Sequence, residues 1–213
     1  MSAVIGLIFI QLSAGSVLQP CSTSGTQAWS KQLQQVLPDC DLVSTSPDRQ
    51  LALRIDPRGR ITATRRDGQK LDTTGLRIGP PAMLSWSPNS NAFFIDDGEG
   101  SGLASVFRLF RIVDSRVTED STIHRNVLQR FRTAMKCSQA RHDQSVWGFG
   151  WSPDGNELFL FVQDGSHYPC GRLPGSSITC VVRVSDGALI QQLTETAAHR
   201  RFGALLPPET FHK

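Results

Sequence analysis

Short apolar runs of strand length, separated by turns rich in Pro, Gly, Asn and Asp, recur along this chain. The run at 157–162 is continuously apolar after its first residue, which is typical of a strand covered on both faces. The runs at 91–95 and 106–112 flank a Gly-rich segment and predict a hairpin. The runs at 50–55 and 60–64 alternate apolar and polar residues, which predicts one solvated face at an exposed end of the fold. The pattern therefore predicts a mainly β chain.

A Trp-Ser-Pro turn precedes two of these strands, at 86–89 and 151–155, and a shorter copy without Trp lies at 46–48. The sequence Ser-Pro-Asp-Gly favours a type I turn, because Pro presets φ and Gly closes the turn. The residues that define the repeated turn are Trp86, Pro88, Trp151, Pro153, Asp154 and Gly155. We expect the two tryptophans to anchor one sheet on the next rather than to line a ligand groove.

The serines of the three turns indicate a period. Ser46 and Ser87 are 41 residues apart, whereas Ser87 and Ser152 are 65 residues apart. The longer interval contains residues 120–143, which are predicted to form a helix, and leaving this segment out restores the shorter spacing. A unit of about 40 to 45 residues is what four short strands and their turns require. Three such units fill residues 40–194.

The turn, followed by an apolar strand, a polar turn and a second strand, resembles the WD40-like blade of TolB-type β-propellers and of prolyl oligopeptidase relatives. The resemblance covers roughly residues 40 to 194 and implies an extracytoplasmic interaction scaffold, without implying one ligand. The expected fold is mainly β, with three four-stranded propeller-like blades, one inserted α-helix and an N-terminal helix. Closed propellers have four or more blades. Three units would therefore leave open edges. We expect the terminal segments to cover these edges. The alternatives are a homodimer that closes the ring, or further blades encoded upstream of residue 1 by a gene whose start is placed too late.

The domain organisation follows from these assignments. Residues 1–20 contain an apolar run followed by small residues, which predicts a signal peptide too short to span a bilayer, with a buried N-terminal strand or helix as the alternative. Residues 21–39 are expected to form an amphipathic N-terminal helical cap. Residues 40–213 are expected to form a single propeller-like domain, with the helical insertion at 120–143 and a capping C-terminal tail at 195–213.

The inserted helix is the least repeat-like segment and the best candidate for a specific role. Apolar residues recur every four positions on one face, at Ile123, Val127, Phe131 and Met135. The other face is cationic, and its candidate partner-binding residues are Arg125, Arg130, Arg132 and Lys136. Either this face is simply solvated, or it joins Arg108, Arg111 and Arg116 in docking an acidic partner or an anionic envelope surface.

Two loops are expected to form a rim beside this helix. They span 98–102 and 167–177, and their candidate contact residues are Glu99, His167 and Arg172. The acidic sequence from Asp96 to Glu99 is interpreted as a solvated hairpin turn rather than a calcium loop, because it lacks the alternating pattern of calcium ligands.

Composition and charge narrow the function. With 39% hydrophobic and 19% charged residues the chain is globular, and its net charge of +3 gives no support for nucleic-acid binding. No nucleophile elbow, zinc-protease motif or phosphate loop is present. We therefore expect a non-catalytic, periplasmic or secreted scaffold that binds another envelope or secreted protein, without a cofactor. The alternative is an enzyme with a dispersed active site, of hydrolase or glycosidase type, or a small-ligand binding protein on the same fold.

Five cysteines in an exported chain favour disulfide formation. Cys170 and Cys180 flank an insertion between two expected strands, so a bridge between them would close a long hairpin loop. Cys21 with Cys40 is the second expected pair, which ties the N-terminal segment to the first unit and leaves Cys137 over. No metal site is predicted, because the chain has no Cys-x-x-Cys sequence.

Overall fold

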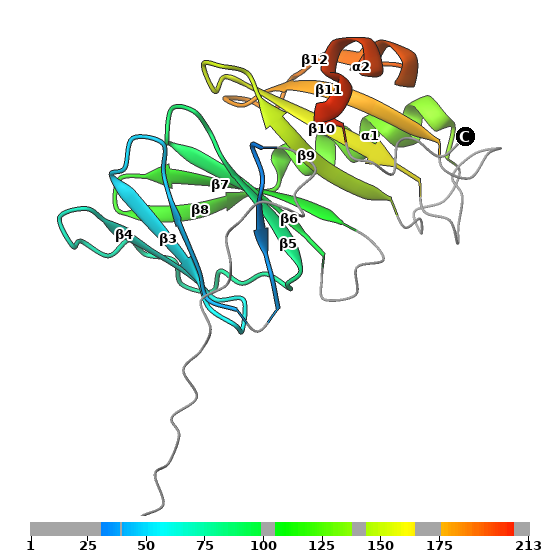
Figure 1. Cartoon of the computed structure of the whole chain (residues 1–213). Coiled ribbons are helices and arrows are strands. Elements are labelled where there is room, and N and C mark those ends of the chain that lie inside the picture. Colours follow the sequence, from blue (N-terminus) through cyan, green and yellow to red (C-terminus); the bar gives the residue numbers. More distant parts are fainter. Residues whose placement is uncertain (1–30, 39, 99–104, 138–143, 165–175, 207–213) are drawn as a thin grey trace, which may run out of the picture.

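Figure 1 shows the computed structural model, which describes residues 31–38, 40–98, 105–137, 144–164 and 176–206. These residues form three antiparallel sheets, which confirms the prediction of a mainly β chain. The four strands predicted for each unit are found in the third sheet, whereas the first sheet has three strands and the central sheet has five. The first sheet has the strand order β2-β3-β4, with bounds Leu42–Thr45, Leu51–Ile55 and Ile61–Arg65. The central sheet has the order β1-β5-β6-β7-β8, with bounds Gln34–Val36, Ala82–Trp86, Ala92–Asp97, Val106–Val113 and Arg116–Asp120. The third sheet has the order β12-β11-β10-β9, with bounds Leu189–Leu193, Ser177–Arg183, Glu157–Gln163 and Ser145–Trp151.

The three Ser-Pro turns share one hydrogen-bond pattern. Through their Oγ atoms, Ser46, Ser87 and Ser152 accept the backbone N–H five residues on, at 3.0, 3.1 and 2.8 Å. Each hydroxyl also donates to the Asp or Asn side chain two residues on, at 2.6, 2.8 and 2.5 Å. In the third turn Gly155 has a φ of +73°, the left-handed region that glycine adopts without steric cost. The same local chemistry therefore closes the hairpin of each sheet.

A second repeated contact joins each sheet to the next. The Trp86 indole N–H donates to Ser44 Oγ in the first sheet at 2.9 Å, and the Trp151 indole N–H donates to Ser85 Oγ in the central sheet at 3.1 Å. The adjoining turns are also linked, because Asn89 Nδ2 donates to the Asp154 carbonyl at 3.4 Å. Each tryptophan thus lies between two sheets, with its apolar body packed and its N–H paired.

Stacking of the sheets creates two cores. One lies between the first and central sheets, and the other between the central and third sheets. The central sheet is therefore covered on both faces, and every residue of β6 is buried. The outer face of the first sheet stays exposed, as at Val43, Arg54 and Thr62. The predicted solvated face at one end of the fold is thus confirmed.

The opposite end is covered by the C-terminal segment. Helix α2 (Glu195–Phe202) and the short 3₁₀ helix Gly203–Leu205 lie on the outer face of the third sheet (Figure 1). The Phe202 ring packs against Phe149 and Phe159, with ring centroids 5.1 and 4.7 Å apart. This segment occupies the position expected for a C-terminal cap.

The expected N-terminal helix is wrong over the described part of 21–39. Residues 34–36 instead form strand β1, which pairs antiparallel with β5 at the free edge of the central sheet. Leu33 and Val36 do not share a helix face, because Leu33 packs in the core beside the third sheet and Val36 in the core beside the first. The unpaired backbone edge of β5 explains the difference, since it offers hydrogen bonds that a helix at this place would leave unused.

Candidate functional site

Helix α1 (Thr122–Met135) follows β8 directly and packs in the core between the central and third sheets. Its first turn is fixed by Asp120, whose Oδ1 accepts the Thr122 backbone N–H at 2.9 Å. Ile123, Val127 and Phe131 are at most 1% exposed, which confirms the predicted apolar face. The helix stops at a left-handed C-cap, Lys136, with a φ of 56°. It is therefore shorter than the predicted segment 120–143, of which 138–143 lie outside the described residues.

The opposite face of α1 carries cations that no carboxylate neutralises within the described residues. The helix itself contains no Asp or Glu. Arg130 Nε donates to Gln192 Oε1 at 2.7 Å, and Arg132 donates to Gln144 Oε1 at 3.2 Å. Both partners are neutral amides, so these contacts hold the guanidinium groups in place and leave their charge intact. Arg125 and Lys136 are exposed and form no ion pair with any described residue.

Three of these cations surround a hollow of about 500 Å³ on the helix surface. The residues that line it are Arg125, Leu128, Gln129, Arg132, Thr133, Lys136 and Cys137. Leu128 is partly buried against the core, so the hollow has an apolar side. An apolar surface bordered by guanidinium and ammonium groups suits carboxylate side chains of a partner. We call these residues the α1 face.

The arginines that precede the helix in sequence are not part of the α1 face. Arg108 pairs with Asp97 at 2.8 Å and with Glu119 at 2.6 Å. Arg111 pairs with Asp120 at 2.8 Å, and the Arg111 guanidinium also donates to the Val184 carbonyl. The prediction that Arg108, Arg111 and Arg116 extend the cationic surface is therefore wrong. Cross-strand carboxylates neutralise the first two, and Arg116 pairs with Asp72 at 3.0 Å.

The cysteine pairing differs from the expectation. Cys180 is a free thiol, 0% exposed, and lies in the core between the central and third sheets. Burial raises the pKa of the Cys180 thiol to about 12. The predicted Cys170–Cys180 bridge is wrong, because Cys180 is a free thiol in the core. Cys40 and Cys137 each form a disulfide, so the expectation that Cys137 is left over is also wrong.

Several predicted residues cannot be placed. Glu99, His167 and Arg172, the candidates on the rim loops, lie outside the described residues, as do Cys21, Cys170 and the expected signal peptide. The rim and the Cys21–Cys40 pairing therefore remain predictions.

A smaller hollow of about 220 Å³ lies where β7 meets the start of α1, and Asp97, Arg108, Glu119 and His124 contribute to it. Arg108 donates to both carboxylates, which ties them into an ion-pair network. Burial lowers the pKa of His124, whose ring also bonds the Phe107 backbone, so the imidazole is neutral at pH 7. These groups stabilise one another, and this arrangement gives no support to the enzyme alternative.

The sequence interpretation missed Asp96. It was expected in a solvated turn, but it is 3% exposed and belongs to β6, facing the third sheet. Asp96 Oδ1 accepts the Gly148 N–H at 2.8 Å, and Oδ2 has no hydrogen-bond partner. Burial raises the pKa of Asp96 well above its usual value of 3.8, while the bond from Gly148 opposes the shift. A buried carboxyl group with a raised pKa thus lies between two sheets.

We expect the variant Asp96→Asn to flatten the dependence of stability on pH. The pKa of Asp96 is raised in the folded state, so its contribution to stability is fully present below the unfolded pKa of 3.8 and is lost as pH rises through the folded pKa. An amide cannot ionise and escapes this loss. Urea unfolding between about pH 4 and pH 8 measures the effect. Asp67→Asn, at an exposed position, serves as the control, and parallel profiles for wild type and Asp96→Asn would contradict the prediction.

Within the described residues, neither helix is long and apolar enough to cross a membrane. Among the same residues, no group of three or more His, Cys, Asp or Glu side chains is arranged to hold a metal ion. No model of a known protein family and no curated protein sequence matches this chain.

Proposed function

We propose that this chain is an extracytoplasmic protein-binding module of incomplete β-propeller type, and that its α1 face docks an acidic surface of another envelope or secreted protein. The propeller interpretation is supported by three stacked antiparallel sheets whose hairpins close with the same Ser-Pro turn. It is also supported by the repeated Trp-to-Ser contact between neighbouring sheets. In this interpretation each sheet is one blade, and α2 takes the place of the next blade.

The observation that carries the binding proposal is the contrast between paired and unpaired arginines. The three arginines on β7 and β8 all have carboxylate partners, whereas the four cations of α1 have none among the described residues. Unneutralised charge of one sign attracts a partner of the opposite sign and orients its approach. The α1 face therefore favours a partner with clustered Asp and Glu.

A protein partner fits the α1 face better than a lipid surface does. Helices that lie in a membrane interface insert an apolar face among the lipids. The apolar face of α1 is already used inside the fold, since Ile123, Val127 and Phe131 are buried. What α1 presents outward is a hollow of about 500 Å³, which complements side chains of a structured partner.

The extracytoplasmic location rests on the cysteines and the N-terminal residues. Disulfides persist in oxidising compartments, and Cys40 and Cys137 are both disulfide-bonded. The expected signal peptide at 1–20 agrees with such a compartment.

We expect the double variant Arg125→Glu, Lys136→Glu to lose at least about tenfold in affinity for the partner, because two attractive charges become repulsive. Capture from native envelope or culture-fluid extracts, quantified by mass spectrometry, measures the loss. Raising the ionic strength from about 0.05 M to 0.5 M should weaken capture by the wild type, since salt screens exposed charges.

The matched control is Arg66→Glu, Lys70→Glu, which changes the net charge equally at exposed positions beside the first sheet. The proposal requires that this control captures the partner as the wild type does. Equal capture by all three proteins, independent of salt, would remove α1 from the binding surface. Retention of the wild type by anionic lipid vesicles, with no captured protein, would favour a membrane surface instead.

A further inference from the structure

Strand β12 forms one edge of the third sheet, on the side away from β9 (Figure 1). Its five residues, Leu189–Leu193, include no charged side chain and no proline. Leu189 and Ile190 are 37% and 45% exposed, and they are two of the four exposed large apolar side chains among the described residues. Ile190 is an extra residue in the pairing with β11, a β-bulge, so residues 191–193 form the regular part of the edge.

The backbone of β12 has hydrogen-bonding groups to spare. In an antiparallel pair, alternate residues of an edge strand direct their N–H and C=O groups away from the neighbouring strand. The backbone of β12 pairs with β11, and no other described segment bonds to it. A further strand could pair with these groups, which is how extended peptides bind to the edges of sheets.

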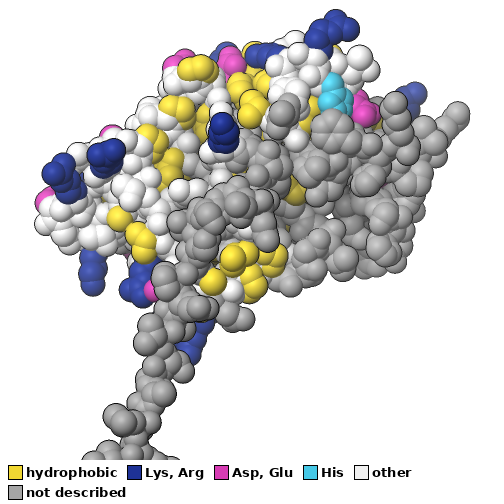
Figure 2. All heavy atoms as spheres, viewed as in Figure 1, with side chains coloured by type: hydrophobic (Ala, Val, Ile, Leu, Met, Phe, Trp, Pro, Cys, Tyr) yellow, Lys and Arg dark blue, Asp and Glu magenta, His cyan; other side chains and the backbone are white. Residues whose placement is uncertain are grey.

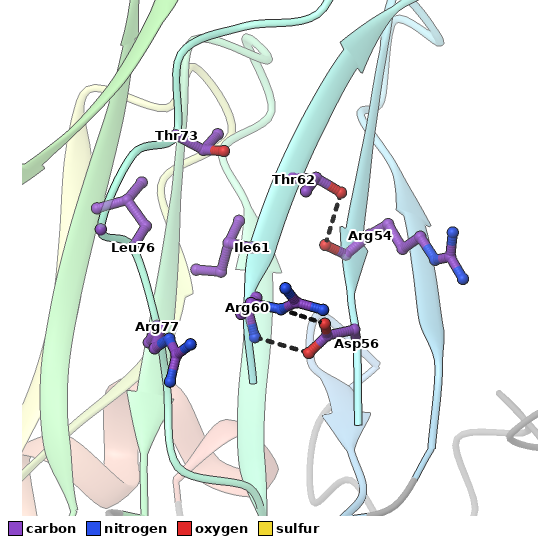
Figure 3. Close-up of a pocket in the computed structure, with 9 residues that line it drawn as sticks. Arg54, Asp56, Arg60, Ile61, Thr62, Thr73, Leu76 and Arg77 are labelled. Atoms are coloured by element: carbon purple, nitrogen blue, oxygen red, sulfur yellow. Dashed lines mark hydrogen bonds and ion pairs between the residues drawn. The ribbon is translucent and has the colours of Figure 1, made fainter. Parts of the chain in front are cut away.

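Other edge strands of the protein carry charges. Strand β8, at the edge of the central sheet, contains Arg116, Glu119 and Asp120, and all three form ion pairs. Figure 2 shows several Lys and Arg side chains over the end of the molecule that β3 and β4 form. Beside β4 the chain returns along the edge, where Arg60 bridges Arg77 (Figure 3). Charged side chains protect an edge from the addition of another strand, and β12 has no such protection of its own.

Two arginines flank the edge of β12, one on each face of the third sheet. Arg130 belongs to α1, on the face toward the central sheet, and its Nε donates to Gln192 Oε1 at 2.7 Å. Arg201 belongs to α2, on the outer face, and its Nη1 donates to Gln191 Oε1 at 2.5 Å. The Arg201 guanidinium also lies over the Phe202 ring, 5.0 Å from its centroid. Neither arginine forms an ion pair with a described residue, so both keep their charge.

The two arginines specify what an added strand must carry. Successive side chains of a strand point to opposite faces of the sheet. A carboxylate opposite Gln191 would therefore lie beside Arg201, and a carboxylate on the next residue would lie beside Arg130 on the other face. Both would form charge-assisted hydrogen bonds. Apolar residues next in the strand would cover Leu189 and Ile190. A second copy of β12 is a poor occupant, because it would bring like charges together.

We propose that the edge of β12 binds an extended segment of a protein partner, which adds a strand to the third sheet. The segment contains two adjacent acidic residues, which bind Arg130 and Arg201, and two neighbouring apolar residues, which cover Leu189 and Ile190. This site shares no residue with the α1 face. It therefore does not depend on the docking proposed for that face.

The test uses the full chain and short synthetic peptides with blocked termini and a fluorescent label, and binding is measured by fluorescence polarisation. One peptide has the central sequence Glu-Glu-Val-Val, and the other has the reverse, Val-Val-Glu-Glu. Antiparallel addition to β12 requires the first order and parallel addition the second, so we expect one peptide to bind more tightly, with a Kd below about 1 mM. Arg201→Gln and Arg130→Gln should each weaken its binding about tenfold, because each removes one charge-assisted hydrogen bond.

Two controls separate strand addition from simple attraction of charge. The tighter peptide with N-methylated central residues keeps its carboxylates but cannot donate to the ladder, and it should not bind. Arg200→Gln removes a charge from an exposed position of the same helix and should bind the peptide as the wild type does. If Arg201→Gln fails to fold, Arg130→Gln carries the same test.

Three results would each overturn the proposal. The first is the absence of saturable binding up to about 10 mM of either peptide. The second is undiminished binding of the N-methylated peptide, and the third is unchanged binding by Arg201→Gln or Arg130→Gln.

Discussion

Replacing Phe202 by alanine is expected to lower the free energy of unfolding by about 3–5 kcal/mol. The Phe202 ring is 9% exposed and contacts Phe149 and Phe159, and these three residues form the centre of the cluster between α2 and the third sheet. Truncation removes the aromatic contacts and leaves a cavity that a short helix cannot close. Weakening this cap should also expose the face of the third sheet, and the variant should self-associate because exposed apolar patches promote association.

Urea unfolding and sedimentation at several protein concentrations measure these two effects. Arg200→Ala is the control, because Arg200 lies on the exposed side of the same helix. Its stability should stay within about 0.5 kcal/mol of the wild type. A loss below about 1 kcal/mol for Phe202→Ala would mean that α2 is not a structural cap.

Replacing Trp151 by alanine is expected to cost a similar amount, about 3–5 kcal/mol. The Trp151 side chain is 4% exposed, packs against Phe94 of the central sheet and donates to Ser85 Oγ. The milder variant Trp151→Phe keeps an aromatic ring but leaves the Ser85 hydroxyl, itself 2% exposed, without this donor. An unpaired buried polar group costs about 1–3 kcal/mol, which is the loss expected for Trp151→Phe.

A double-mutant cycle with Ser85→Ala separates the hydrogen bond from the packing. The Trp151→Phe substitution should cost less in the Ser85→Ala background than in the wild type, because the hydroxyl that loses its donor is already absent. Trp147→Phe is the comparison, since Trp147 stacks on Phe161 on the opposite face of the third sheet. Additive effects of Trp151→Phe and Ser85→Ala would show that this contact does not couple the sheets.

Local patterns in the sequence predicted the features that depend on neighbouring residues. The Ser-Pro turns were recognisable because each serine bonds within five residues of itself. The apolar face of α1 was recognisable because its spacing matches one helical face. Of the four predicted cations, Arg125, Arg132 and Lys136 line the hollow of the α1 face, whereas Arg130 bonds Gln192 of β12 and does not line it.

Features that depend on pairing across sheets were not predictable in this way. Residues 34–36 satisfy a helical pattern, but the free edge of β5 decides their conformation. Asp96 looked solvated because three of its neighbours are polar or Gly, whereas β6 is covered on both faces. The neutralisation of Arg111 by Asp120 requires the antiparallel pairing of β7 with β8.

The proposed binding surface is tested most directly by site-specific photo-cross-linking in the native cells. A photoreactive residue at position 129 lies on the hollow of the α1 face, and one at position 113 lies on the exposed hairpin between β7 and β8. The account predicts a cross-linked protein rich in Asp and Glu from position 129, absent from position 113 and lost in the Arg125→Glu, Lys136→Glu background. The same product from both positions, or a product from 129 that survives the charge reversal, would contradict the account.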